Sequence, residues 1–266
     1  AGVQGAAFDM QEGPKIENVV GGGVYVDNGG QVTISGTITG IKADAEMWQG
    51  RNGVAVHNRG GSNVVLTGTS VISNISSTAY SDGNAVLGSY ASNLEMQKDA
   101  VMTDVNGLMA VYMNDEGNNY SHTSYIDGVI SNVVNNPVMR SWYGLIHIGP
   151  NGIVQNCTAK DNWKDGQLLY TNNGSHYVIE GSLLNNKGTV LYIANQSGAR
   201  PEVVMKAGAV ISGTRGAGLL GSGVAVRVNN GALFTMEGGT ITDNGIGVEV
   251  SGKTNFKGVT FVMNGG

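Results

Sequence analysis

Short runs of alternating apolar and polar residues recur along the whole chain, separated by glycine and asparagine. One class of run begins directly after a glycine and carries apolar residues at alternate positions. Its members follow Gly23, Gly53, Gly83, Gly107, Gly144, Gly166, Gly188, Gly223 and Gly245. Alternation with a period of two predicts short β-strands bounded by turns. Three of the steps between successive glycines (144 to 166, 166 to 188 and 223 to 245) are 22 residues long, which indicates a repeated unit.

Two further classes of run precede the glycine runs. One class comprises residues 71–75, 129–133, 153–157, 210–214 and 240–244, and the other comprises residues 31–36, 63–68 and 232–239. Each repeat is therefore predicted to hold about three short strands. Such a unit cannot bury its apolar face alone, but stacked units close a shared core. The pattern predicts an all-β parallel β-helix of about nine coils, a single domain over residues 1–266, with loops in the longer steps.

The run at residues 238–250, with Phe234-Thr235-Met236 before it, carries a family resemblance. Together with residues 21–26 and 29–34, it resembles the repeats of large bacterial and archaeal surface adhesin-like proteins built as right-handed β-helices. The resemblance implies a right-handed coil and an extracellular, cell-surface location. It also implies a partner on a host or neighbouring cell surface, either a protein or a glycan, and a monomer within a longer chain.

The composition excludes several other classes of protein. The chain has 266 residues, of which 43 are glycine and 4 are proline, and 13% are charged. Low charge with 41% apolar residues argues against disorder. A net charge of −5 without a basic block argues against nucleic-acid binding, and no apolar stretch is long enough to insert into a membrane. No phosphate loop, zinc motif or calcium repeat occurs, so no cofactor or metal is expected. The chain begins at Ala1 without a leader, and we interpret it as a piece of a longer protein.

Polar residues at inner positions are the informative exceptions to the pattern. If the first and third residues after each glycine point inward, Asn84, Gln167 and His147 break the apolar column. The single cysteine, Cys157, aligns with the apolar residues of the preceding strand class and is also expected to face inward. Cys157 and Gln167 are therefore predicted to meet at one corner of one coil.

This juxtaposition suggests an internal thioester. The Cys157 sulfur would attack the Gln167 side-chain carbonyl and expel ammonia, with His147 taking or delivering the proton. The product would be an acyl group for an external amine or hydroxyl, and it resembles in function the thioester domains of Gram-positive adhesins. In the alternative interpretation, Cys157 is a small core residue, Gln167 bonds a corner backbone group, and His147 is a satisfied inner histidine.

Aromatic residues and acids support two other hypotheses. Trp142, Tyr143 and Trp163, with Trp48 elsewhere, could form a contact surface for a glycan or protein at the entrance to the corner, or could pack loops against the rod. A non-covalent stalk or glycan-binding solenoid is therefore the second hypothesis. A polysaccharide lyase or hydrolase is the third, and it would need paired carboxylates. The candidate pairs are Asp44 with Glu46, Asp115 with Glu116, and Asp161 with Asp165, and none recurs in register on neighbouring coils.

Overall fold

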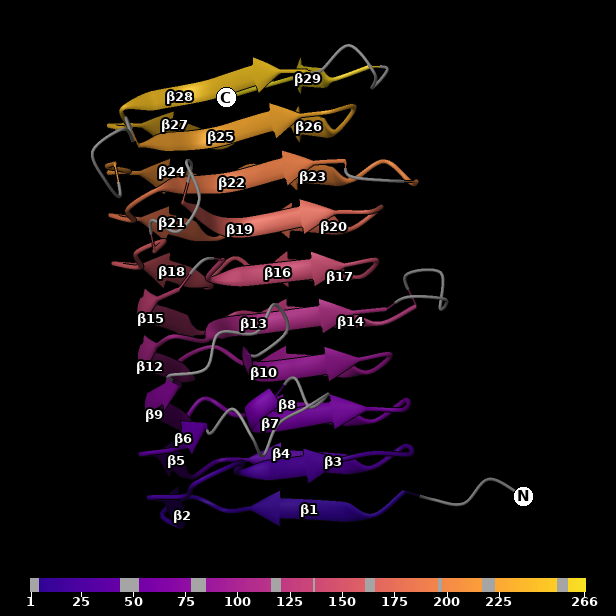
Figure 1. Ribbon diagram of the computed structural model, residues 1–266, viewed down its shortest axis with the longest axis vertical. Coiled ribbons are helices and arrows are strands. Elements are labelled where there is room, and N and C mark those ends of the chain that lie inside the picture. The colour runs from indigo at the N-terminus through magenta and orange to yellow at the C-terminus, as the bar shows by residue number, and fades with distance from the viewer. Residues whose placement is uncertain are drawn as a thin grey trace.

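The computed structural model shows a rod of stacked parallel strands. It describes residues 5–43, 53–77, 85–115, 121–135, 137–160, 166–195, 198–216, 223–252 and 258–266. Within these ranges the chain forms 29 strands and no helix, so no described segment is a helix that could cross a membrane. The strands stack along the long axis of the molecule in three parallel sheets (Figure 1). The predicted all-β class and parallel solenoid architecture are confirmed.

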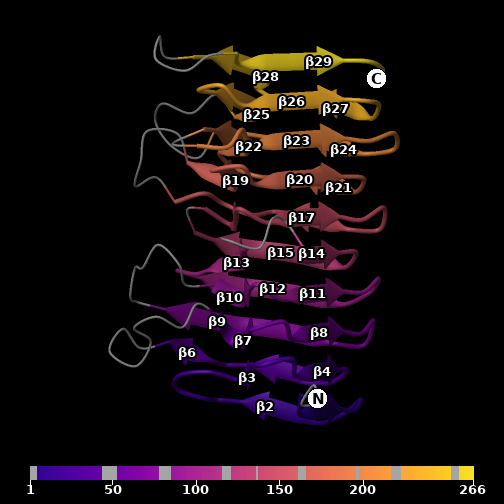
Figure 2. The same ribbon diagram turned by 90° about the vertical axis from the view of Figure 1, so that its right-hand side faces the viewer.

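The three sheets, here called A, B and C, run the length of the rod, and Figure 2 shows the stacked strands of sheet A. Sheet A contains β1 (Ala7–Met10), β4 (Gln31–Ile34), β8 (Asn63–Leu66), β11 (Asn93–Met96), β14 (Thr123–Ile126), β17 (Leu145–Ile148), β20 (His176–Ile179), β23 (Glu202–Met205), β26 (Leu233–Met236) and β29 (Thr260–Met263). Sheet B contains β2 (Lys15–Glu17), β5 (Thr37–Thr39), β9 (Val71–Ser77), β12 (Val101–Asn106), β15 (Val129–Val134), β18 (Ile153–Gln155), β21 (Ser182–Leu184), β24 (Val210–Ser212) and β27 (Thr240–Thr242), with β6 (Lys42–Ala43) beside β9. Sheet C contains β3 (Val24–Val26), β7 (Gly53–Arg59), β10 (Ala85–Tyr90), β13 (Met109–Asn114), β16 (Met139–Trp142), β19 (Gln167–Asn172), β22 (Thr189–Ala194), β25 (Val224–Asn229) and β28 (Ile246–Ser251).

The chain visits the sheets in the repeating order A, B, C, and the three classes of run in the sequence correspond to them. The runs that follow glycine form sheet C, with one exception. The strand after Gly144, β17, belongs to sheet A, and the sheet C strand of that part of the chain is β16. The alignment of Gly144 with the other glycines was wrong because a glycine marks a corner and does not specify which sheet follows it.

The core fills the space between the three sheets. In sheets A and B buried and partly exposed residues alternate, as in β8, where Val64 and Leu66 are buried and Asn63 and Val65 are partly exposed. Sheet C departs from strict alternation, because two successive residues near the start of a strand both pack in the core. Leu168 with Leu169 in β19 and Ala225 with Val226 in β25 are examples. An irregularity of this kind, like a β-bulge, shifts the side-chain phase by one position.

The long connections all border sheet C. Residues 44–52, 78–84, 156–166 and 213–223 lead into it from sheet B, and residues 115–122, 195–201 and 252–259 lead out of it to sheet A. By contrast, the connections from sheet A to sheet B are short, such as residues 35–36 between β4 and β5. Solenoids often place binding functions at inserted segments, which makes sheet C the candidate binding face.

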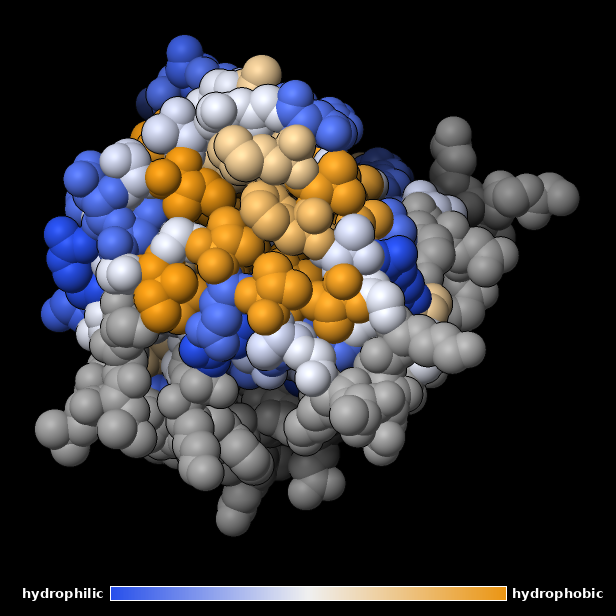
Figure 3. Space-filling view, turned by 90° about the horizontal axis from the view of Figure 1, so that it is seen from above, coloured by the Kyte–Doolittle hydropathy of each residue, from blue (hydrophilic) through white to orange (hydrophobic). Residues whose placement is uncertain are grey.

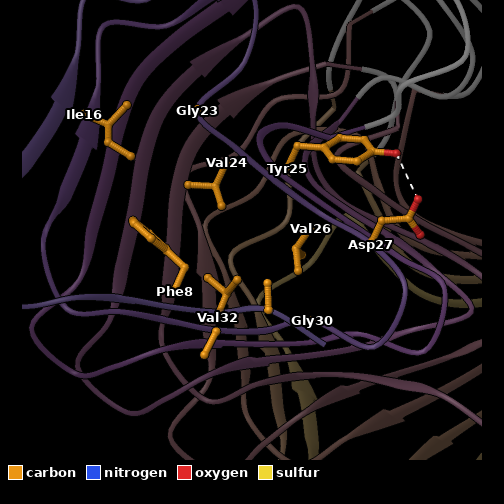
Figure 4. A pocket seen from close by; sticks show the side chains of 11 residues that line it. Phe8, Ile16, Gly23, Val24, Tyr25, Val26, Asp27, Gly30 and Val32 are labelled. Atoms are coloured by element: carbon orange, nitrogen blue, oxygen red, sulfur yellow. Dashed lines mark hydrogen bonds between the residues drawn. The ribbon is translucent and has the colours of Figure 1, made fainter. Parts of the chain in front are cut away.

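At both ends of the rod, apolar residues are exposed to solvent. At the N-terminal end a pocket of about 410 Å³ is lined by apolar side chains that include Phe8, Ile16 and Val32 (Figure 4). At the C-terminal end Val250 and Met263 are exposed, and hydrophobic residues gather on this face (Figure 3).

Candidate functional site

Cys157 lies where the sequence predicts, at the inner side of the sheet B corner. Its side chain is fully buried in the core cluster that also contains Ile75 and Val133. The Sγ–H group donates to the carbonyl oxygen of Gln155 at 3.3 Å, and the backbone N–H of Cys157 donates to Oδ1 of Asn186 at 2.9 Å. Burial raises the pKa of the thiol to about 11. The sulfur is therefore protonated at neutral pH, which weakens it as a nucleophile.

His147 does not join Cys157 in one inward cluster, and the contact between Cys157 and Gln167 stays a prediction. Gln167 begins β19 and is half-buried, and the adjacent Leu168 and Leu169 make the core contacts there. His147 lies on the outer face of sheet A, between the buried Ile146 and Ile148.

The outward position of His147 is reinforced by its neighbours. Its Nε2 lies 3.4 Å from a carboxylate oxygen of Glu180, and its ring meets that of Tyr125 edge-on. The prediction that His147 points inward is therefore wrong. The cause is the misassigned strand after Gly144, since β17 has the phase of sheet A.

Of the aromatic candidates, Trp142 and Tyr143 lie within the described residues. Trp142 ends β16 on the outer face of sheet C, and Tyr143 follows at the corner to sheet A. Both are partly buried, and their ring centroids lie 6.3 Å apart. The remaining candidates Trp163, Trp48, Asn84, Asp44, Glu46, Glu116, Asp161 and Asp165 lie outside the described residues.

Aromatic rings line the outer face of sheet C over many strands. Tyr25 stacks on His57 at 4.9 Å, and the ring of Tyr90 follows at 6.0 Å from His57 and 5.7 Å from Tyr112. Farther along, Arg140 lies over the rings of Trp142 at 4.7 Å and Tyr170 at 5.5 Å, and Tyr170 meets Tyr192 at 5.6 Å. His57, Tyr112 and Tyr170 are buried, whereas Tyr90, Trp142 and Tyr192 are partly exposed.

These rings belong to a surface that is separate from the core. Ala85, Met109 and Tyr112 form their own buried cluster, and Tyr90 and Trp142 pack against it. Burial and the neighbouring Tyr112 raise the pKa of the Tyr90 phenol, so this hydroxyl stays protonated and serves as a hydrogen-bond donor.

One register row on this face alternates rings with amides. Tyr90 pairs with Asn114, Asn114 with Trp142, and Trp142 with Asn172 on successive strands. Adjacent strands of a sheet lie about 4.8 Å apart, so the two rings of this row are separated by about 10 Å along the rod. The sequence could not show this row, because the alignment of its members depends on the lengths of the connections between them.

A buried carboxylate beside this row positions a histidine. The side chain of Asp115 is fully buried, and its oxygens accept from Nδ1 of His122 at 2.7 Å and from the His122 backbone N–H at 3.2 Å. Because a carboxylate only accepts, Nδ1 carries the hydrogen of this contact. Asp115 also donates its backbone N–H to the carbonyl of Trp142 at 3.0 Å, which places the pair beside the row. The sequence analysis considered Asp115 only with Glu116 and missed His122.

The charges on the outer face of sheet C are paired near both ends of the ring series. Arg59 lies 3.5 Å from a carboxylate oxygen of Asp27, and Arg227 bonds Glu249 at 3.0 Å. Among the described residues, no group of three histidine, cysteine or acidic side chains is placed to hold a metal ion.

Comparison with known proteins adds no family assignment. No protein-family model matches the chain, and no curated protein is significantly similar to it.

Proposed function

We propose that this chain is an extracellular attachment module that holds a partner on a host or neighbouring cell surface through the outer face of sheet C. The observation that carries the proposal is the series of aromatic rings on that face. Aromatic side chains provide large contact area at low entropic cost and are typical of recognition surfaces. The adhesin-like resemblance of residues 238–250 supports a cell-surface setting, as part of a longer chain. We infer a right-handed winding of about nine coils, because parallel crossover connections are almost always right-handed.

The attachment is non-covalent in this proposal. A covalent mechanism through a Cys157–Gln167 thioester has one observation in its favour, since both residues flank the same corner between sheets B and C. The protonated thiol opposes it. Intact mass distinguishes the two mechanisms, because loss of ammonia makes the thioester form lighter by about 17 Da. We expect the mass of the unmodified sequence.

The attachment itself is tested with purified protein on immobilised, fixed cells of several types. We expect saturable binding that a double variant, Tyr90→Ala with Trp142→Ala, reduces at least tenfold. A matched double variant on the outer face of sheet A, Tyr125→Ala with His147→Ala, should bind as the unmodified chain does. Equal binding by the two double variants, or complexes that resist boiling in detergent, would refute non-covalent attachment through sheet C.

A further inference from the structure

We propose that the outer face of sheet C binds a neutral polysaccharide laid along the axis of the rod, with His122 accepting a hydrogen bond from one of its hydroxyl groups. This inference rests on the proposed function and names the ligand class of the same face. It is carried by three independent features: the alternation of rings and amides, the pairing of charges, and the histidine fixed by Asp115.

The first feature is the row Tyr90, Asn114, Trp142, Asn172. A pyranose ring presents C–H groups on its face and hydroxyl groups at its edge. An aromatic ring can stack on the C–H face of the sugar. An amide, which both donates and accepts hydrogen bonds, can bond the hydroxyl groups at its edge. The two rings lie about 10 Å apart along the rod, which is close to the length of a disaccharide unit in an extended polysaccharide. Alternate sugars would therefore stack on Tyr90 and Trp142, and the sugar between them would meet Asn114.

Exposure limits the accessible part of the row to three residues. Tyr90, Asn114 and Trp142 are partly exposed, whereas Asn172 is fully buried. The buried Tyr112 supports Tyr90 and Trp142 from the same cluster. Arg140 lies over Trp142 and restricts its ring, so the stacking surface is fixed before a ligand arrives. Preorganisation of this kind lowers the entropic cost of binding.

The second feature, the charge, selects among polysaccharides. The chain carries a net charge of −5. On this face Asp27 neutralises Arg59 and Glu249 neutralises Arg227. A polyanion such as a uronic acid polymer would gain little from paired cations and would be repelled by the overall charge. A neutral polysaccharide needs no free cation for binding and is not repelled by the negative charge of the protein.

The third feature is the Asp115–His122 pair. The His122 side chain is 20% exposed, and the contact between its Nδ1 and Asp115 fixes its orientation. In the neutral tautomer with its hydrogen on Nδ1, Nε2 is the acceptor that the proposal assigns to a sugar hydroxyl, and Asp115 itself bonds the backbone of Trp142. A hydroxyl group of the sugar stacked on Trp142 is the donor that this acceptor suits.

The experiment is affinity electrophoresis of the chain in gels containing hydroxyethyl cellulose, xyloglucan or mixed-linkage glucan, with alginate and polygalacturonate as anionic polymers. We expect retardation by at least one neutral polymer and none by the anionic ones. Trp142→Ala should weaken binding at least tenfold, Trp142→Tyr should retain most of it, and His122→Ala should weaken it about threefold to tenfold. His147→Ala on sheet A is the matched control and should bind normally, and circular dichroism checks the fold of each variant. Retardation only by anionic polymers, or by none of the polymers, would overturn the proposal, as would binding insensitive to Trp142→Ala.

Periodate treatment of the fixed cells separates this proposal from the attachment function. Periodate cleaves vicinal diols of sugars, so we expect it to abolish attachment. If attachment survives periodate and is still lost in the Tyr90→Ala, Trp142→Ala variant, the sheet C surface binds another class of partner and the polysaccharide proposal is wrong. If attachment is absent from untreated cells while the gels show retardation, the attachment function fails and the polysaccharide site stands.

Discussion

The side chain of Asn186 holds the backbone of the coil that contains Cys157. Its Oδ1 accepts from the N–H of Cys157 at 2.9 Å, and its Nδ2 donates to the carbonyl of Val154 at 3.0 Å. Asn244 repeats the arrangement toward the C-terminal end, with Thr214 and Ile211. Along this column of sheet B the buried Cys157 is followed by Asn186, Thr214 and Asn244, and the two amides among them bridge neighbouring coils.

Removal of this bridge should destabilise the rod. Asn186→Ala leaves a buried donor and a buried acceptor without a partner, which costs about 3 kcal/mol of unfolding free energy. Urea denaturation measures the difference. Asn63→Ala is the matched control, since Asn63 bonds the exposed side chains of Gln31 and Asn93, and it should change stability by less than about 0.5 kcal/mol. An equal effect of the two substitutions would contradict the bridging role.

The buried thiol should make stability fall at alkaline pH. Burial raises the pKa of Cys157 from 9.0 to about 11, so the unfolded chain loses this proton first as the pH rises. The contribution is complete below pH 9 and is lost as the pH rises through 11, by about 3 kcal/mol at most. Cys157→Val, which matches the neighbouring Val133, removes it.

The measurement is the difference in unfolding free energy between Cys157→Val and the unmodified chain, from pH 8 to pH 11. This difference cancels the contributions of Tyr90, Tyr125 and Tyr177, whose pKa values are also raised. It should change steadily in favour of the variant above pH 9. A constant difference would mean that no titrating thiol is present in the folded chain, as expected of a thioester.

The sequence repeat predicted the architecture, but the site depended on which sheet each strand joins and on the inward or outward phase of single residues, which the repeat does not specify. The alternating runs and the inward position of Cys157 follow from local pattern, because each strand must bury one face. The predicted orientation of His147 was wrong because the strand that follows Gly144 belongs to sheet A and not to sheet C. The inward position expected of Gln167 stays a prediction, because Gln167 is half-buried at the start of β19, where the consecutive pair Leu168 and Leu169 interrupts strict alternation.

The ligand-binding row was beyond sequence reasoning for a different reason. Tyr90, Asn114 and Trp142 are separated by 24 and 28 residues, steps that differ from the basic repeat of 22. Their alignment appears only when the strands are in register. The Asp115–His122 contact closes a connection between two sheets, and no periodicity specifies such a contact.

Close approach of backbones should make one corner glycine irreplaceable. A Cβ atom on Gly181 would overlap the carbonyl oxygens of Gly152 and Gly149, which belong to the coil below. Backbone cannot move aside as a side chain does, so Gly181→Ala should cost at least about 2 kcal/mol and lower the melting temperature by about 5 °C.

Gly247 in β28 provides the control for this substitution. Its nearest neighbour would be Cγ2 of Ile241 at 3.8 Å, an ordinary contact. Gly247→Ala should leave the melting temperature unchanged or raise it slightly, because alanine restricts the unfolded chain. A similar loss at both positions in thermal unfolding would show that backbone overlap is not the cause.

Tyr143 combines an unfavourable backbone conformation with a place beside the ligand row. Its φ is 59°, in the left-handed region, where most other non-glycine residues of this chain are asparagine or aspartate. A bulky residue there costs about 1 kcal/mol or more, and such strain is found at functional sites. Comparison of Tyr143→Asn with Tyr143→Ala isolates this cost, since both lose the ring but only asparagine tolerates the conformation well. We expect the asparagine variant to be more stable by about 1 kcal/mol, and both to bind neutral polysaccharide more weakly than the unmodified chain.

At Tyr192, where φ is not positive, asparagine should have no advantage over alanine in denaturant titrations. If alanine and asparagine are equivalent at position 143, the tyrosine is not strained, and its place at the corner needs another explanation.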